Sequence, residues 1–379
     1  MEAARRADEQ AQSDMAASQT AAILREDRDA SQLNLLIVDD SPMMRKILAG
    51  MLTTSDQIKV AGMAGNGKEA ISMIDELSPD LVLLDINMPV MDGISTIKHI
   101  MIKKPCPVVI TSNPGDGSSK TIFNFLELGA VDFMSKPTKN QDIILQQKKI
   151  LERIRIAATA KVRNFRIARL NKTGAAAVSR QVKKAACRRV AVVISGPGGH
   201  PEQMRLLFEL VPAMGEIGGA VVAIQTLPPF FSEPFARYVS ERCGCPAAAI
   251  RERTNLYAGH CYVGIHGCPL KFDAFEGGTI IDPWQVGNGL IPVERLLKST
   301  ASVFGRRSAV VLLSGADTGD QTGIRAVRDR GGRIFVRDHR TSLVAGPLEK
   351  VINAGLADEE IKPESLVKAI LNGFEKNGP

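Results

Sequence analysis

The sequence predicts an α/β protein made of two doubly wound, parallel-sheet domains. At 379 residues, the chain is long enough for two domains that each bury a core of their own. In both halves, short apolar runs alternate with stretches of helical periodicity, which is the pattern of consecutive βαβ units. Between the two alternations, the segment NKTGAAAVSRQ (171–181) has the small and polar residues of a flexible linker.

The first alternation predicts a domain over residues 33–156. The residues before it, 1–32, are rich in Ala, Gln, Ser and charged residues, so we expect a flexible tail there. Apolar residues in 141–170 have helical spacing with a basic opposite face, which predicts a helix that leads into a basic linker over 157–187. The expected strands are LLIV (35–38), DLVLLD (80–85), PVVIT (107–111) and VDFM (131–134).

The second alternation predicts a domain over residues 188–379. Helical stretches separate its apolar runs, so we again expect a parallel sheet with helices on both faces. The expected strands are VAVVI (190–194), GAVVAIQ (219–225), SAVVLLSG (308–315) and GRIFV (332–336).

The composition excludes several classes of protein. With 44% hydrophobic and 23% charged residues, the chain has the balance of a globular protein. No uninterrupted apolar run reaches the ~20 residues of a membrane span, and the N-terminus lacks the apolar core of a signal peptide. The six cysteines make no disulfide framework at this length, so we expect reduced thiols and a cytoplasmic location.

The net charge of +7 is concentrated in one segment. Residues 138–190 hold fifteen Lys and Arg against two acids, a net charge of +13, which leaves −6 for the rest of the chain. Such a segment could attract nucleic acid or anionic lipid. Because no helix-turn-helix or RNA-binding motif accompanies it, we expect a solvated face or a contact with an acidic partner, and no nucleic-acid partner.

Acidic side chains fall at the ends of the predicted strands of the first domain. Asp39 and Asp40 follow the first strand and Asp85 ends DLVLLD, while Thr111 ends PVVIT and Lys136 follows VDFM. Ligands of an open parallel sheet bind at the carboxyl ends of its strands. Clustered carboxylates suit Mg²⁺, and such a cation would let Asp85 act as a nucleophile toward a phosphodonor. Lys136 would pair with the phosphoryl group, and Thr111 would hydrogen-bond it.

These residues resemble the response-regulator receiver family, which has a flavodoxin-like fold. The matching segments, in order and at the family's spacing, are IVDDSPMMRKIL, LVLLDINMPVMDG, VVITS and GAVDFMSKP. The resemblance implies that Asp85 is phosphorylated by a histidine kinase. It further implies that Asp40, Asp85 and the Asn87 carbonyl hold Mg²⁺ with help from Asp39, and that Thr111 and Phe133 form the switch pair, Phe133 swinging inward on phosphorylation.

The second half is similar to the Rossmannoid effector domain of the chemotaxis methylesterases of the CheB family, which remove methyl esters from receptor glutamates. The segments that carry the similarity are VAVVISGPGGHPEQM (190–204), VVAIQTLPPFFSEPFARYV (221–239) and VVLLSGADTGDQTGIRAVRDRGGRIFVRDHRTSLVAGP (310–347). Together they imply a receiver followed by a methylesterase-like domain, acting in a chemotaxis-type two-component system.

The catalytic triad of that family is missing at the matched positions. Counting from flanking residues that match, the serine position holds Gly196, the histidine position Thr226 and the aspartate position Gly319. Ester hydrolysis of this kind needs a nucleophile, a base and a group that orients the base. The sequence therefore predicts a catalytically inactive domain.

A relocated triad is the alternative. Ser195 lies one residue before the empty serine position, and Asp317 and Asp320 flank the empty aspartate position. His200 is near Ser195 in sequence, but we expect the turn to aim it along the following helix and away from Ser195. Nothing replaces the imidazole at Thr226, and loss of one triad member removes several orders of magnitude in rate.

The predicted function is phosphorylation-controlled binding. A histidine kinase of a chemotaxis-type system would phosphorylate Asp85, and the degenerate domain or the basic linker would then engage a chemoreceptor or another signalling protein. Two alternatives remain. One is an active protein-glutamate methylesterase or glutaminase with a relocated triad, and the other is a phosphate sink that drains the kinase through Asp85.

Overall fold

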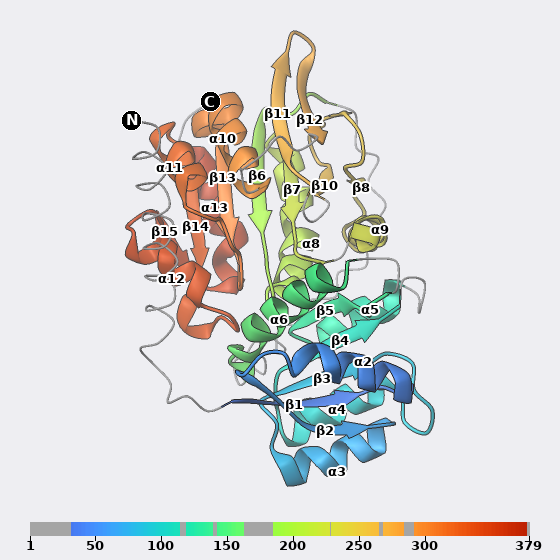
Figure 1. Cartoon of the computed structure of the whole chain (residues 1–379). Coiled ribbons are helices and arrows are strands. Elements are labelled where there is room, and N and C mark those ends of the chain that lie inside the picture. The colour runs from blue at the N-terminus through green and yellow to red at the C-terminus, as the bar shows by residue number, and fades with distance from the viewer. Residues whose placement is uncertain are drawn as a thin grey trace, which may run out of the picture.

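The computed structural model describes residues 32–113, 119–138, 142–162, 185–227, 229–264, 268–283 and 292–376. The chain forms two α/β units, the first drawn in blue to green and the second in yellow-green to red (Figure 1). Most of the expected tail (1–32) and most of the expected basic linker (157–187) lie outside the described residues. No helix within the described ranges is long and apolar enough to cross a membrane.

The first unit is a five-stranded parallel sheet with the strand order β2-β1-β3-β4-β5. Each of the four expected strands is present, and β2 is an additional edge strand that mixes exposed and buried residues. Its elements are β1 (Leu33–Val38), α2 (Pro42–Leu52), β2 (Ile58–Ala64), α3 (Gly67–Leu77), β3 (Leu81–Asp85), α4 (Gly93–Lys103), β4 (Val108–Ser112), α5 (Ser119–Leu128), β5 (Asp132–Ser135) and α6 (Ile143–Ala158).

The second unit is a seven-stranded parallel sheet with the strand order β15-β14-β13-β6-β7-β10-β8. The prediction of two doubly wound parallel sheets is thus confirmed. The elements of this sheet and its helices are β6 (Arg189–Ile194), α8 (His200–Glu216), β7 (Gly219–Ile224), α9 (Ser232–Cys243), β8 (Ala247–Ala249), β10 (Cys261–Val263), α10 (Pro292–Phe304), β13 (Ser308–Leu312), α11 (Thr322–Asp329), β14 (Arg333–Arg337), α12 (Gly346–Asn353), β15 (Glu359–Ile361) and α13 (Leu366–Lys376).

A small antiparallel sheet was not predicted from the sequence. It has the order β11-β12-β9, with β9 (Thr254–Asn255), β11 (Leu270–Phe275) and β12 (Gly278–Pro283). The β11–β12 hairpin projects from the second unit at the top of Figure 1.

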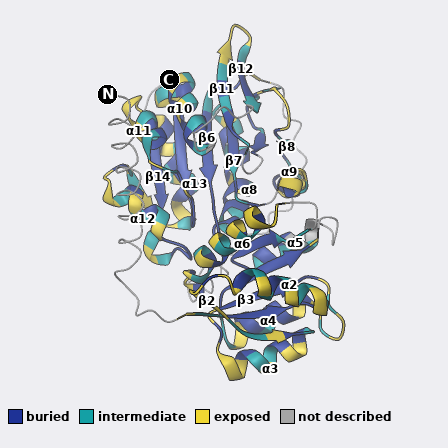
Figure 2. Cartoon of the chain, viewed as in Figure 1, coloured by how far each residue is buried: buried dark blue, intermediate teal, exposed yellow. Residues whose placement is uncertain are grey.

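The two parallel sheets form because their central strands are apolar on both faces. In β3 and β13 every residue is buried, as expected for strands covered by helices on both sides. Figure 2 shows these strands as buried, while the outer faces of the surrounding helices are exposed. Side-chain caps set several helix starts. Ser41, for example, accepts a hydrogen bond from Met44 N at the start of α2.

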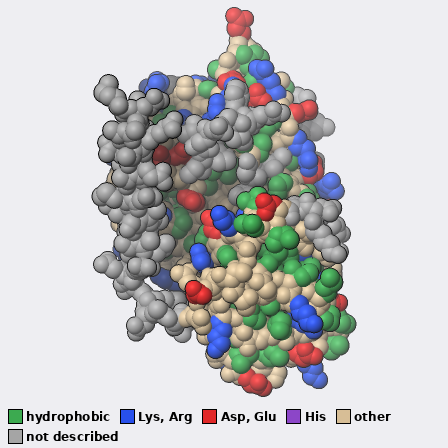
Figure 3. All heavy atoms as spheres, viewed as in Figure 1, with side chains coloured by type: hydrophobic (Ala, Val, Ile, Leu, Met, Phe, Trp, Pro, Cys, Tyr) green, Lys and Arg blue, Asp and Glu red, His purple; other side chains and the backbone are tan. Residues whose placement is uncertain are grey.

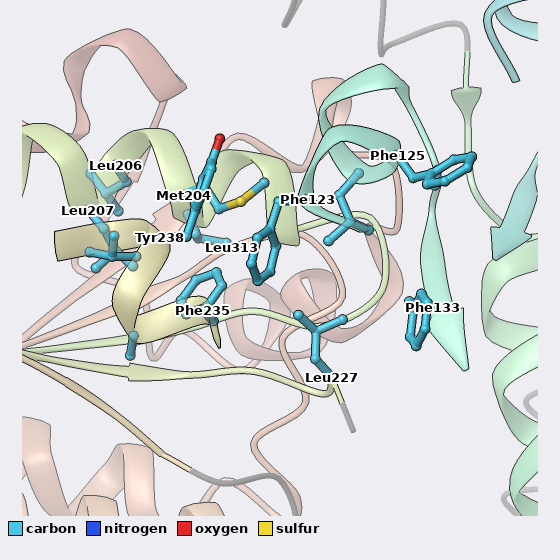
Figure 4. Close-up of a cluster of buried hydrophobic side chains, with 14 of the residues drawn as sticks. Phe123, Phe125, Phe133, Met204, Leu206, Leu207, Leu227, Phe235, Tyr238 and Leu313 are labelled. Carbon is cyan, nitrogen blue, oxygen red and sulfur yellow. The ribbon is translucent and has the colours of Figure 1, made fainter. Parts of the chain in front are cut away.

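The units meet through aromatic packing. Phe123 of α5 lies 4.9 Å from Tyr238 and 5.7 Å from Phe235, both on α9, between ring centroids. Figure 4 shows this cluster, in which Phe123 lies among side chains of the second unit. The Tyr238 hydroxyl also donates to Glu127 Oε1 at 2.8 Å. Aromatic pairs of this kind add to the stability that burial alone gives.

On the face seen in Figure 3, the described Lys and Arg side chains are dispersed among acidic and apolar ones. Seven of the fifteen Lys and Arg of residues 138–190 lie in residues 163–184, which fall outside the described ranges. Whether this charge faces a partner thus stays a prediction.

Candidate functional site

Five polar side chains lie along the carboxyl edge of the first sheet. Asp39 follows β1, Asp85 ends β3, and Thr111 is the residue of β4 directly opposite Asp85 in the strand register. Lys136, just after β5, bridges the two carboxylates, with Nζ 2.8 Å from Asp39 Oδ2 and 2.9 Å from Asp85 Oδ2. These four residues are buried, while Asp40 is exposed at the same edge. The residues that the sequence placed at strand ends therefore lie at one edge of the folded sheet.

The three carboxylates are close enough to share a cation. One oxygen of each of Asp39, Asp40 and Asp85 lies within 4.8 Å of the others, and carboxylate oxygens are the ligands that Mg²⁺ prefers. Asn87 lies two residues beyond Asp85 on the exposed loop after β3. The donor set thus fits the expected cation.

The electrostatics of Asp85 depend on its burial. Burial and the neighbouring Asp39 charge raise the pKa of Asp85, Lys136 and the backbone N–H of Ile86 lower it, and the net result is a pKa of about 6. Burial alone would lower the pKa of Lys136, but its hydrogen bonds to Asp39 and Asp85 outweigh this and raise it. The lysine therefore stays a cation beside the carboxylate, which is the arrangement needed to hold an anion at this edge.

Phe133, the predicted switch aromatic, is already buried in this structure. It lies in β5 opposite Ile110 of β4. Its ring packs edge-on against Phe231 of the second unit, with centroids 4.5 Å apart at an angle of 80°. Phe133, whose position is predicted to change when the receiver is phosphorylated, thus forms part of the contact between the two units.

In the second unit, the expected serine position has no room for a side chain. A Cβ built on Gly196 would lie 1.8 Å from the carbonyl oxygen of Gly315 and 2.5 Å from its carbonyl carbon. Gly196 N also donates to Ser314 O at 3.1 Å. The backbone that follows β13 therefore closes directly over the turn that follows β6, and it occupies the place of the nucleophile.

The other two triad positions also lack catalytic groups. Gly319 has a left-handed φ of +70°, a conformation that glycine adopts without steric cost. Thr226 follows β7, and its carbonyl accepts a hydrogen bond from Arg153 of α6 at 2.9 Å. A helix of the first unit thus binds directly to the position where the family has its histidine.

The expected orientation of His200 was wrong. His200 is the first residue of α8, but its Nδ1 lies 3.5 Å from Ser195 Oγ and its Nε2 lies 3.3 Å from Thr226 Oγ1. The reason is that Gly198, at φ +77°, tightens the turn and directs the first helical residue back toward the strand ends. An imidazole therefore does stand beside Thr226, supplied from α8.

The carboxylate beside His200 comes from the other unit. Asp132 Oδ1 lies 3.5 Å from His200 Nε2, and Arg153 binds both oxygens of Asp132 at 2.6 and 2.9 Å. Desolvation would raise the pKa of Asp132, but the Arg153 charge and the contacts with His200 lower it overall. Sequence reasoning missed Asp132 and Arg153 because their roles depend on how the two units dock.

The acids proposed for a relocated triad make other contacts. Asp317 Oδ1 accepts from Gly319 N at 3.0 Å, and Asp320 Oδ1 accepts from Thr322 N at 2.8 Å. Asp320 N also donates to Glu294 Oε1 at 3.2 Å. These local contacts stabilise the loop after β13.

The group formed by Ser195, His200 and Asp132 is closed to solvent. Their exposed fractions are 1%, 0% and 0%. A serine and an imidazole at 3.5 Å form the beginning of a nucleophile–base pair, but in this arrangement no substrate reaches it.

Two family models match the chain, one in each unit. Residues 35–148 match the response regulator receiver domain, and residues 192–370 match the CheB methylesterase. A protein-glutamate methylesterase/protein-glutamine glutaminase from Albidiferax ferrireducens is 31% identical over 362 residues, covering 91% of this chain and 95% of that protein. Its counterpart from Pyrococcus abyssi is 28% identical and covers 89% and 94%.

Solved structures of Thermotoga maritima CheB are also similar to the chain. The response regulator domain is 34% identical and covers 35% of this chain and 99% of that one, with a TM-score of 0.32. The methylesterase catalytic domain is 21% identical and covers 50% and 98%, with a TM-score of 0.42.

Proposed function

Because the chain belongs to the CheB methylesterase family and carries a response regulator receiver domain, we propose that it is a response regulator whose output is protein binding and not ester hydrolysis. The observation that carries the proposal is the contact between Gly196 and Gly315. With a carbonyl oxygen 1.8 Å from the place of a Cβ, the position of the nucleophile cannot hold a serine in this backbone arrangement.

The receiver supplies the input of the proposed function. Asp85 is the phosphoacceptor, and Lys136 neutralises the charge that arrives on it. Asp39, Asp40, Asp85 and the Asn87 carbonyl would hold Mg²⁺, which would shield the charge of the phosphodonor during transfer. The phosphodonor is a histidine kinase of a chemotaxis-type system. The short distances from Lys136 to both buried carboxylates support this assignment.

The contact between the units supplies the transmission. Thr111 lies opposite Asp85, and Phe133 on the neighbouring strand packs against Phe231 of the effector domain. A phosphoryl group on Asp85 that draws Thr111 toward it would change the space available to Phe133 and weaken this contact. A difference of a few kcal/mol between the two states is enough to shift the population of docked domains.

The output of the proposed function is binding of a partner to the surface of the effector domain that the docked receiver covers. When the receiver leaves, the strand ends around Gly196 and Thr226 become accessible to a chemoreceptor or another signalling protein. The loss of the triad argues against chemistry there, since removing one triad member alone reduces the rate by several orders of magnitude.

The contact between Ser195 and His200 favours a second candidate, a hydrolase with a relocated nucleophile. The position of the orienting carboxylate argues against this candidate. The carboxylate that would orient His200 is Asp132 of the receiver, so undocking would expose Ser195 and remove that carboxylate in one step.

The first experiment measures methanol release from methylated chemoreceptor by the full-length protein, with and without acetyl phosphate. A family member with an intact triad serves as the positive control. We expect no release above background in either state. Release that increases with acetyl phosphate and disappears in Ser195→Ala would establish the relocated hydrolase instead.

A second experiment separates a binding protein from a phosphate sink. Partners retained by the wild-type protein with acetyl phosphate are compared with those retained by Asp85→Asn. A partner that binds only the phosphorylated wild type supports the proposal. Identical binding by both proteins would contradict it, and fast phosphoryl decay with a dispensable second domain would support a sink.

A further inference from the structure

One edge of the receiver sheet lies across the vestigial active site. In the order β2-β1-β3-β4-β5, β5 is an edge strand. Val131, just before it, donates its N–H to Val108 O within the receiver and accepts from Gly198 N of the effector domain at 2.6 Å. The glycine turn at the expected nucleophile position therefore binds the backbone at the edge of the receiver sheet.

The next residue, Asp132, points its carboxylate at His200. The imidazole has polar neighbours at both nitrogens, Ser195 Oγ on one side and Thr226 Oγ1 with Asp132 Oδ1 on the other. Each of these residues except Thr226 is buried. Since buried polar groups need partners, Asp132 completes the environment of His200 in the docked state.

The third residue, Phe133, supplies an aromatic ring. It packs against Phe231 at 4.5 Å, and its carbonyl accepts from Arg153 Nη2 at 2.8 Å. Val131, Asp132 and Phe133 thus present a backbone carbonyl, a carboxylate and a ring to three separate features of the effector domain.

We propose that Val131–Phe133 is an internal pseudoligand, and that the vestigial active site is a socket for a partner segment with the same apolar–acidic–aromatic pattern. This inference rests on the proposed function and names the chemistry that the undocked domain recognises. Gly198 N–H would bind the partner's backbone, His200 its carboxylate and Phe231 its ring.

The choice of an acidic partner follows from what undocking removes. Arg153 leaves together with Asp132, because both belong to the receiver. His200 then keeps Ser195 and Thr226 as neutral neighbours and loses its anionic one. A carboxylate restores that neighbour, and a hydrogen bond to an ionised acceptor is stronger than one between neutral groups.

The test uses the chain's own segment as the probe. A fluorescein-labelled peptide of residues 129–135, GAVDFMS, is titrated with full-length protein in Mg²⁺, with and without the phosphomimetic beryllium fluoride, and anisotropy is recorded. The matched control peptide carries Asn in place of Asp. We expect the activated protein to bind the Asp peptide about tenfold more tightly than the Asn peptide, the range of one charge-assisted hydrogen bond.

Two variants assign the effect to the socket. His200→Gln should bind both peptides with equal affinity, because it keeps a polar side chain and loses the imidazole that faces Asp132 in the docked state. Asp132→Asn should bind the Asp peptide without beryllium fluoride, because its internal competitor is weakened. Equal binding of the two peptides by wild type, discrimination that survives in His200→Gln, or failure of every form to bind would overturn the proposal.

Hydrogen exchange of β5 separates the two proposals. Exchange of residues 132–135 that rises with beryllium fluoride, without peptide binding, would overturn the socket and leave the proposed function in place. If beryllium fluoride left the exchange of residues 132–135 unchanged in wild type, the proposed function would be contradicted. Peptide binding by Asp132→Asn would still test the socket, because this variant is expected to bind without beryllium fluoride.

Discussion

Both domains place their candidate site at the carboxyl ends of parallel strands, yet the two sheet edges are filled in different ways. At the receiver edge, Asp39 and Asp85 are held apart by the Lys136 ammonium, 2.8 and 2.9 Å from their oxygens. At the effector edge, the Gly315 carbonyl approaches Gly196 so closely that a side chain has no space. Charged side chains separate the strand ends at the receiver edge, which we call the open edge. Backbone contacts backbone at the effector edge, which we call the closed edge.

The difference lies in what fills the space at the strand ends. At the receiver edge, charged side chains fill the space between the strand ends: one oxygen of each of Asp39, Asp40 and Asp85 lies within 4.8 Å of the others, and Lys136 pairs with two of the three carboxylates. Glycine has no side chain to maintain a gap, and close packing favours filling any void. The inactivity that we propose for the effector edge would therefore be a property of the backbone, and we expect that a serine at position 196 alone will not produce activity.

The largest expected effect concerns the open edge. Asp85→Asn removes the nucleophile and should reduce phosphorylation by acetyl phosphate by at least about 100-fold, since an amide oxygen forms no stable acyl phosphate. Phosphorylation is measured by the mobility shift on phosphate-affinity gels. Glu69→Gln, an exposed substitution on α3, is the control and should leave labelling unchanged. Substantial labelling of Asp85→Asn would move the phosphoacceptor to another residue.

The next effect concerns the closed edge. Gly196→Ser should restore no esterase activity and should lower the free energy of unfolding by roughly 3 kcal/mol, because the new Cβ forces the Gly315 backbone to move. Urea denaturation measures the change. Gly346→Ser is the matched control, since a Cβ there meets nothing within 4 Å, and it should change stability by less than about 0.5 kcal/mol. Methanol release by Gly196→Ser would show that the two edges are more alike than the backbone contact suggests.

The sequence was sufficient for the two parallel sheets and for the charged residues at the receiver edge, because both depend on local patterns. The strands β3, β4 and β13 are buried along their length, and β6 is buried after its first residue, so these strands contain continuous apolar runs. Asp39 and Lys136 each directly follow a strand, and Asp85 ends one. Once the strands are assigned, these charged residues are therefore located at the carboxyl edge of the sheet.

The closed edge was only partly predictable. The missing triad is visible in the sequence, but the closure over Gly196 depends on two loops that are far apart in the chain. The direction of His200 depends on the left-handed backbone of Gly198, and its contact with Asp132 depends on domain docking. Short elements such as β8 and β9 carry too few residues to show a period.

A third prediction tests whether the two edges communicate through the aromatic contact. Phe231→Ala should make docking of the unphosphorylated domains less favourable by roughly 2 kcal/mol, because the Phe231 ring is 3% exposed and packs on Phe133. Hydrogen exchange of β5 is the measurement, and it should rise toward the level of the phosphorylated wild type. Phe275 of β11 is 48% exposed and belongs to the projecting hairpin, so Phe275→Ala is the control and should have little effect. Equal exchange in both variants would mean that docking does not depend on the switch strand.

The smallest expected effect separates polar from apolar contributions to docking. Tyr238→Phe keeps the ring that packs on Phe123 and removes the hydroxyl that donates to Glu127 at 2.8 Å. A partly buried hydrogen bond contributes about 1 kcal/mol, so exchange of β5 should rise several-fold less than in Phe231→Ala. Glu127→Gln, which can still accept the bond, should have an effect between those of wild type and Tyr238→Phe. If Tyr238→Phe instead matched Phe231→Ala, docking would depend mainly on a charged contact. Salt would then undock the domains without a phosphoryl group, and the effector edge would be controlled by charge, like the receiver edge.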